Sequence, residues 1–131
     1  MKNVLKIDFE GKRIIIGRVG EKCGNVHLVD GKYWITDNAL KADLLSNEVS
    51  YEYLELALMV IELGRYRIVS AQPSISQNTI LSLSIPVPTF DIQKRIVNYV
   101  NEIRKEIKFK SDHVDLIKIK VRELFNQTIF E

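Results

Sequence analysis

The sequence predicts an α+β fold, in which a small strand-rich domain with short helices is followed by a long projecting coiled-coil helix. All six glycines lie in residues 1–64 and all three prolines in residues 73–88, so turn-forming residues are confined to the first part of the chain. Short β-branched runs lie between these turns, which is typical of strands. After Pro88, apolar residues recur at alternating steps of three and four, as in a helix that pairs with another helix. We therefore divide the chain into a domain, residues 1–88, and a helix, residues 89–131.

The composition is that of an ordinary globular protein. Hydrophobic residues make up 46% and charged residues 27% of the 131 residues, which is enough for one domain with a modest core. The longest apolar run, Leu56–Ile61, is too short to cross a bilayer, and the N-terminus lacks the apolar segment of a signal peptide. Cys23 is the only cysteine, so no internal disulfide can form. These features predict a cytoplasmic protein with no membrane contact.

The charge is too balanced to identify a nucleic-acid partner by itself. The net charge is +2, and residues 1–88 carry ten Lys/Arg against ten Asp/Glu. Residues 11–33 are locally basic, with five Lys/Arg against two acidic residues. A basic loop region is therefore expected there, without a basic stripe along the whole chain.

The first 45 residues predict short strands. Arg13–Ile16 is β-branched, and Val26–Val29 follows a glycine-rich loop. Tyr33–Thr36 follows Asp30-Gly31, and Asp-Gly between two strand-like runs is a hairpin signal. We therefore expect Val26–Val29 and Tyr33–Thr36 to pair as a hairpin.

Two serines are placed to begin helices. Ser50 precedes a helical pattern over residues 51–63, and Gly64 stands where a C-terminal cap is expected, before a strand over residues 65–70. Ser76 precedes a shorter helical turn over residues 77–81. Apolar and polar residues then alternate over residues 83–87, which predicts an edge strand because Pro86 lacks a backbone donor.

The last part of the chain predicts a single helix that begins at Pro88-Thr89 and is about 60 Å long at 1.5 Å per residue. Seven of nine positions along one face are apolar, which sustains the heptad spacing over four repeats. Lys110 is a polar position that could fix the register of pairing. The alternative is a helical hairpin broken near Lys110–Asp112. The predicted pairing face comprises Val100, Ile103, Ile107, Lys110, Val114, Ile117, Val121, Leu124 and Thr128.

Catalytic and metal-binding residue patterns are weak. Cys23 and His27 are four residues apart and His113 is distant, which fits neither a zinc site nor an activated thiol. We expect Cys23 to be a buried structural thiol and His113 a solvated helix residue. The sequence indicates no enzyme and no cofactor.

Two segments are candidates for contact with a partner. GRVGEKCGN, residues 17–25, matches neither common phosphate-loop pattern, so it is either a tight turn or a loop against a nucleic-acid backbone, with Arg18, Lys22 and Asn25 as contacts. GKYWITDNAL, residues 31–40, contains aromatic residues that are more often core than ligand. Its Thr36, Asp37 and Asn38 can form a local turn or contact base edges.

These segments, together with AQPSISQNTILSLSIPVPTFDIQKRIV and a long helix, resemble the specificity subunit of type I restriction–modification systems. The residues that match the family pattern are Ser76, Leu83, Ile85, Pro86, Pro88, Gln93, Lys94, Ile96 and Val97. Two positions depart from it, since Ile92 replaces a glutamate and Thr89 a second proline.

The resemblance implies a target recognition domain that reads DNA bases, followed by a helix that pairs antiparallel with a second helix. That helix would space two DNA half-sites and dock methyltransferase subunits, while the subunit itself is not catalytic. The implied partners are double-stranded DNA, methyltransferase subunits and a second half-subunit or a second copy of this chain. The implied DNA contacts are Arg18, Lys22 and Asn25, with Thr36, Asn38, Gln72 and Gln77 as weaker candidates.

The resemblance covers nearly all of the chain but only part of a half-subunit. Residues 1–88 are therefore expected to be a partial target recognition domain, from a truncated product, a split gene or a domain fragment. The alternative function is that of a helix-pairing assembly or regulatory protein that does not contact DNA.

Overall fold

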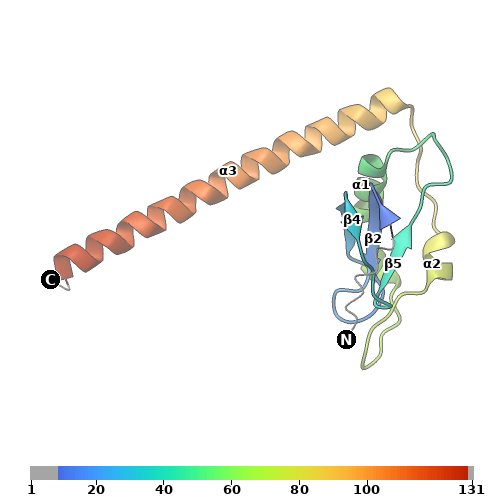
Figure 1. Ribbon diagram of the computed structural model, residues 1–131, viewed down its shortest axis with the longest axis horizontal. Coiled ribbons are helices and arrows are strands. Elements are labelled where there is room, and N and C mark those ends of the chain that lie inside the picture. Colours follow the sequence, from blue (N-terminus) through green and yellow to red (C-terminus); the bar gives the residue numbers. More distant parts are fainter. Residues whose placement is uncertain (1–8, 130–131) are drawn as a thin grey trace, which may run out of the picture. The chain divides into compact units, whose positions relative to one another are not determined.

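The computed structural model describes residues 9–129, and it confirms the α+β fold with small antiparallel sheets, short helices and a long C-terminal helix (Figure 1). The chain divides into two compact units, and the boundary falls between Lys94 and Arg95. Residues 1–8 of the expected domain, residues 130–131 and the side chain of Thr128 lie outside the described residues. The two units are described separately below.

The centre of the first unit is a three-stranded antiparallel sheet. Its middle strand is β2 (Arg13–Gly17), flanked by β3 (Val26–Val29) on one side and β5 (Ala39–Ala42) on the other. A separate two-stranded sheet pairs β1 (Phe9–Glu10) with β4 (Lys32–Tyr33). The strands predicted at residues 13–16 and 26–29 are therefore confirmed.

The predicted hairpin across Asp30-Gly31 is wrong, because β3 pairs with β2 and β4 pairs with β1. Gly31 has a φ of +124° and exchanges two backbone hydrogen bonds with Gly11, so the Asp-Gly turn carries the chain from one sheet to the other. The predicted strand also ends at Tyr33. Beyond it the chain bends, since the Asn38 amide donates to Thr36 Oγ1 at 3.4 Å and the Ala39 amide to the Thr36 carbonyl at 3.2 Å.

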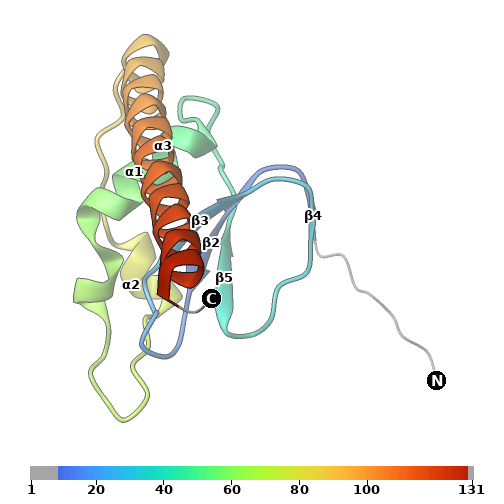
Figure 2. The ribbon, with the colours of Figure 1, turned by 90° about the vertical axis from the view of Figure 1, so that its left-hand side faces the viewer.

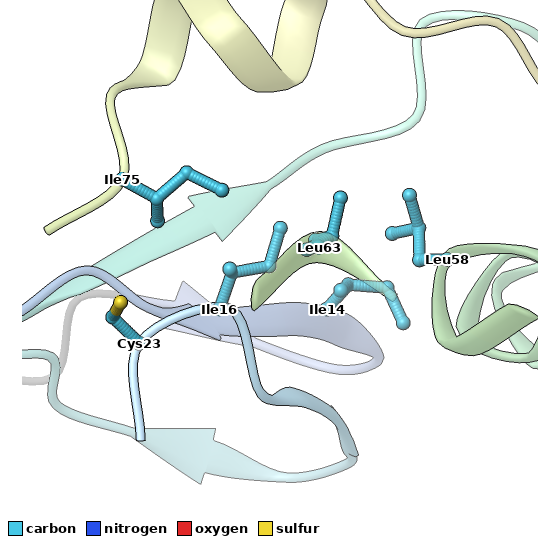
Figure 3. Packing of buried hydrophobic residues seen from close by; sticks show 6 residues of the cluster. All are labelled: Ile14, Ile16, Cys23, Leu58, Leu63 and Ile75. Carbon is cyan, nitrogen blue, oxygen red and sulfur yellow. The ribbon is translucent and has the colours of Figure 1, made fainter. Parts of the chain in front are cut away.

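One face of the three-stranded sheet carries the core, and α1 and α2 lie on that side of it (Figure 2). Alternation along β2 buries two isoleucines, and Figure 3 shows them with the other side chains of the cluster, which come from α1, η1 and the loops. Cys23 is 2% exposed within this cluster, which confirms the expected buried thiol. The cluster comprises Ile14, Ile16, Cys23, Leu58, Leu63 and Ile75.

The helix α1 (Tyr51–Ile61) begins as predicted, since Ser50 Oγ accepts the Tyr53 amide at 3.1 Å. Its Glu55 carboxylate accepts the Leu28 amide at 3.1 Å, which ties the helix to the edge strand β3. The cap predicted at Gly64 is wrong, because Glu62 takes the left-handed conformation with a φ of 57°.

The strand predicted over residues 65–70 is also wrong. Residues Leu63–Tyr66 form the 3₁₀ helix η1, in which the Arg65 amide bonds to the Glu62 carbonyl at 2.9 Å. Only Ile68 then makes a bridge, with Ser74. The alternating pattern failed here because the short-range bonds of the 3₁₀ turn engage the backbone that a strand would need.

The helix α2 (Gln77–Leu81) confirms the second serine cap, since Ser76 Oγ accepts the Thr79 amide at 3.1 Å. The strand predicted over residues 83–87 is absent. Its alternation survives partly as burial, because Leu83 and Ile85 are half-buried while Val87 is 47% exposed. The segment is held instead by Tyr53, whose hydroxyl donates to the Pro86 carbonyl at 2.7 Å.

The helix α3 (Phe90–Ile129) confirms the predicted helix start and has no break at Lys110–Asp112. Its first turn belongs to the first unit and buries the Gln93 side chain to 1% exposure. Gln93 Oε1 accepts the Ser50 amide at 3.0 Å, and its Nε2 donates to the carbonyls of Glu48 and Pro88. No helix in the described part of the chain is long and apolar enough to cross a membrane.

Candidate nucleic-acid interface

The connections of the three-stranded sheet gather at one end of it, where β2 finishes and β3 and β5 begin. The register pairs Ile16 with Val26 and Gly17 with Ala39, so the segments next to these residues leave from the same edge. We call this edge, with residues 17–25, 36–39, 62–68 and 70–77, the loop end. The opposite edge, with Lys12, Arg13, Asp43, residues 50–52 and Gln93, is the helix-start end.

Backbone hydrogen bonds join three loop-end segments that are distant in the sequence. The Arg18 amide donates to the Asn38 carbonyl at 2.8 Å, and the Arg18 carbonyl accepts the Ile75 amide at 2.9 Å. The Gly20 amide donates to the Pro73 carbonyl at 2.8 Å. Residues 18–20 are thus clamped between the other two candidate segments, and this brings the predicted contact residues together.

All seven residues that are predicted to contact DNA are exposed and lie at the loop end. Arg18, Lys22 and Asn25 belong to the loop between β2 and β3, and Thr36 and Asn38 to the bend before β5. Gln72 adjoins Pro73, and Gln77 is the first residue of α2, where it also lines a cavity of about 290 Å³. Trp34, which was expected in the core, is instead 60% exposed, because the chain bends where a strand was predicted.

Gly24 in this loop is required by the chain's own packing. Gly24 has a φ of +88°, and a Cβ there would lie 2.4 Å from the Gly64 nitrogen. The loop amides are also used internally, since those of Cys23, Gly24 and Asn25 donate to carbonyls of the same loop at 2.8–3.1 Å. The backbone of this loop therefore packs closely against the Gly64 backbone of the same chain. Contacts with a ligand would come from the side chains of the loop.

A hollow of about 680 Å³, which no sequence pattern predicts, lies beside this loop. One wall is the start of β3 with Asn25, and the other is the end of α1 with the turn that follows. Arg65 and Arg67, which had been assigned to a strand, lie on this second wall. The Gly24–Gly64 contact helps to bring them close to Asn25, and a sequence pattern does not record such a contact. The hollow is lined by Gly24, Asn25, Val26, His27, Leu58, Met59, Glu62, Leu63, Gly64, Arg65, Arg67 and Val69.

The helix-start end is rich in ion pairs. Lys12 Nζ bonds to the Glu52 carboxylate, and Asp43 forms ion pairs with Arg13 Nε at 2.6 Å and with Lys41 Nζ at 3.4 Å. The hydrogen bond from Lys12 lowers the pKa of Glu52, although partial burial opposes it, and the same bond raises the pKa of Lys12.

The cations of the loop end are arranged differently. Among the described residues, Arg18, Lys22 and Arg67 have no carboxylate within 4.0 Å, and Arg65 has only Glu62 at 3.9 Å. Acidic residues are present nearby, at Glu21 and Asp37. The loop end therefore offers cations that are free for an anionic ligand, without being uniformly basic.

Neither a metal centre nor a catalytic cluster emerges from the described part of the chain. It contains no group of three or more His, Cys, Asp or Glu residues that could hold a metal ion. His27 is exposed on β3, and His113 is exposed on α3, where its ring stacks on Phe109 at 6.4 Å between centroids.

The second unit presents the predicted pairing face without any break in the helix. Ile107 is 62% exposed, Val114 and Ile117 are each 49% exposed, and Leu124 is 61% exposed. Lys110 Nζ lies 3.4 Å from Glu106 on the same helix, so its charge is balanced locally. A second set of apolar side chains, Phe109, Leu116 and Ile119, is 49–72% exposed at positions outside this spacing.

Comparison with known proteins identifies the family. The family model described as the type I restriction modification DNA specificity domain matches residues 1–118. The EcoprrI type I restriction enzyme specificity subunit of Escherichia coli is 27% identical over 84 residues, which are 64% of this chain and 21% of that protein.

A solved structure shows that the fold is shared. The S subunit of a type I restriction–modification system from M. genitalium superposes with a TM-score of 0.71 at 19% identity, and the match covers 95% of this chain and 34% of that one. The chain thus spans about a fifth of one relative and a third of the other. The expected non-catalytic role agrees with these names, which describe specificity components. The family match over residues 1–118 shows that this chain belongs to the type I restriction–modification DNA specificity domain family.

Proposed function

We propose that this chain reads double-stranded DNA with its loop end and uses α3 as a spacer and pairing arm. The observation that carries the proposal is the clamping of residues 18–20 by the Asn38 carbonyl and by the segment around Pro73 and Ile75. It gathers three exposed polar segments on one edge of a sheet. Loops positioned by a rigid scaffold are a common way to build a binding site.

The side chains of the loop end suit the two tasks of DNA recognition. Arg18 and Lys22 have no carboxylate within 4.0 Å among the described residues, so they are available to neutralise phosphates. Asn25, Asn38, Gln72 and Gln77 carry amides, which can pair with adenine in a major groove. The first group would supply affinity and the second would supply base choice.

The test of DNA reading is an electrophoretic titration of a duplex library at several salt concentrations, alone and with methyltransferase subunits. Binding should weaken steeply with salt, because each neutralised phosphate releases counterions. Arg18→Gln and Lys22→Gln should each lower the slope of log affinity against log salt by about one. The absence of binding to every duplex under both conditions would contradict the proposal.

The pairing role of α3 follows from its apolar face. Exposed isoleucines and valines at heptad spacing need a partner helix, because an isolated helix leaves them in water. We propose that the partner is a second copy of this chain or another specificity half-subunit, and that the paired helices dock methyltransferase subunits. Two paired copies related by symmetry would match two DNA half-sites.

Substitutions on two faces of α3 test the pairing. Ile103→Asp with Ile117→Asp should abolish self-association in sedimentation equilibrium, because two charges would enter each pairing face. Phe109→Asp with Ile119→Asp makes the same chemical change outside the heptad spacing and should leave association intact. A wild-type monomer at micromolar concentration, or equal loss in both double variants, would argue against the predicted face.

A second function is that of a helix-pairing assembly protein that does not contact DNA. The balance of ten basic and ten acidic residues in residues 1–88, with Glu21 and Asp37 at the loop end, favours this alternative. It would show self-association without DNA binding in the two experiments above.

A further inference from the structure

The hollow beside the loop between β2 and β3 brings Arg65 and Arg67, which are not among the predicted contact residues, close to Asn25. Its volume of about 680 Å³ is large enough for a small ligand, and its lining contains both apolar and basic side chains. We infer that Arg65 and Arg67, with Lys22 from the facing loop, bind the phosphodiester backbone of DNA at this hollow. The inference deepens the proposed function and rests on it.

The packing of two glycines fixes the position of these arginines. The Leu63–Gly64 backbone lies so close to Gly24 that a Cβ on Gly24 would be 2.4 Å from the Gly64 nitrogen and 2.9 Å from the Leu63 carbonyl carbon. Arg65 follows directly, inside the 3₁₀ helix η1. The start of the 3₁₀ helix is thus held against the loop between β2 and β3, and Arg65 within the helix and Arg67 just after it are placed at the same end of the sheet as Lys22.

The Arg67 side chain lies back over this contact. One of its guanidinium nitrogens, Nη1, would be 3.7 Å from a Cβ built on Gly64. The guanidinium therefore lies near the same glycine that packs against the loop between β2 and β3, and Arg67 lines the hollow beside it.

The charges at the hollow favour an anion that is bound by side chains and not by backbone amides. Within the described residues, no carboxylate lies within 4.0 Å of Arg67 or Lys22. Arg65 has Glu62 at 3.9 Å, but both side chains are more than two-thirds exposed, so this pair contributes little and can be exchanged for a phosphate. The amides of Cys23, Gly24 and Asn25 already donate to loop carbonyls, so the arginines and the lysine are the charged donors that remain for an anion.

The apolar part of the lining is compatible with the rest of a nucleotide. Leu58, Met59 and Val69 contribute to it, and such surface can pack against deoxyribose while the arginines hold the phosphates. Phosphate contacts carry no base information, so this site would add affinity for every DNA sequence alike. It would also orient the duplex so that the amides of the loop end face the bases.

The experiment compares Arg65→Gln, Arg67→Gln and the double variant with Lys32→Gln in duplex binding, alone and with methyltransferase subunits. Lys32 is an exposed residue of β4, away from the hollow, and its replacement by glutamine removes the same charge. Each arginine variant should weaken binding about tenfold for target and non-target duplexes alike and lower the salt slope by about one. Lys32→Gln should change neither quantity comparably. Glu62→Gln should strengthen binding, because it removes the negative charge beside Arg65.

The outcomes separate this inference from the proposed function. If the double arginine variant bound DNA as tightly as the wild type, and urea unfolding showed both proteins to be folded, the inference alone would be overturned. An equal effect of Lys32→Gln would also overturn it, since a general loss of charge would then explain the result. A wild-type protein that binds no duplex under either condition would overturn the proposed function and this inference together.

Discussion

At the helix-start end of the three-stranded sheet, cations lie against carboxylates, whereas at the loop end the cations have few or no such partners among the described residues. The first group is Lys12, Arg13 and Lys41, paired with Glu52 and Asp43. The second group is Arg18, Lys22, Arg65 and Arg67, of which only Arg65 has a carboxylate of the described residues within 4.0 Å. The same residue types thus stabilise the fold at one end and are available for a partner at the other.

The two ends of the sheet also differ in whether their polar side chains are buried. At the helix-start end, the buried Gln93 satisfies one backbone amide and two carbonyls. At the loop end, the predicted contact residues have exposed side chains, and backbone amides such as those of Arg18, Gly20 and Gly24 donate to backbone carbonyls. We conclude that the helix-start end fixes the start of α3 on the domain, while the loop end keeps its side chains free. Three substitutions, each with its own control, test this difference between the two ends.

The largest effect is expected at Gly24. Replacement by alanine places a Cβ 2.4 Å from the Gly64 backbone and forces a side chain into a φ of +88°, so it should cost roughly 3 kcal/mol or more of unfolding free energy. Urea unfolding measures the cost.

Gly20 is the matched control for this substitution. It has the same φ of +88°, but a Cβ there meets nothing within 4 Å. Gly20→Ala should therefore cost only about 1 kcal/mol, from backbone strain alone. Equal costs at the two glycines would mean that the packing of the loop between β2 and β3 on Gly64 does not hold the loop end together.

A smaller effect is expected at Gln93. Gln93→Ala removes three hydrogen bonds to backbone groups around Glu48, Ser50 and Pro88, and should cost about 2–3 kcal/mol because these groups lose their partner. The neighbouring exposed Lys94→Ala should change stability by less than about 0.5 kcal/mol. If thermal and urea unfolding showed the two variants to be alike, the buried amide would not anchor α3.

The smallest effect is expected at the Lys12–Glu52 pair, whose side chains are 48% and 33% exposed. Lys12→Met should cost less than about 1 kcal/mol at neutral pH. The lowered pKa of Glu52 means that its contribution is present above the ordinary value of 4.5 and is lost as the pH falls through the folded value. The raised pKa of Lys12 means that its contribution is present below 10.5 and is lost as the pH rises through the folded value.

Urea unfolding of wild type and Lys12→Met across this pH range tests the pair. The difference between the two proteins should be constant between these limits and vanish in acid. A difference that persists when Glu52 is protonated would show that Lys12 stabilises the fold by packing rather than by charge.

Local signals in the sequence determined the elements that depend on neighbouring residues. Ser50 and Ser76 cap α1 and α2 as predicted, because a serine oxygen needs only the amide three residues ahead. The start and continuity of α3 were equally predictable, since neither glycine nor proline follows Pro88. The family resemblance, carried by residues 76–97, indicated the DNA specificity class, which the family match shows.

Only the tertiary structure decided how the segments meet. The Asp30-Gly31 turn joins two sheets instead of closing a hairpin, and residues 65–70 do not form the strand that their alternation predicted. Both results depend on contacts between distant residues, namely the Gly11–Gly31 hydrogen bonds and the Gly24–Gly64 approach. The candidate DNA residues could be listed from the sequence, but the gathering of Arg65 and Arg67 with them could not, because it requires two glycines forty residues apart to pack backbone against backbone.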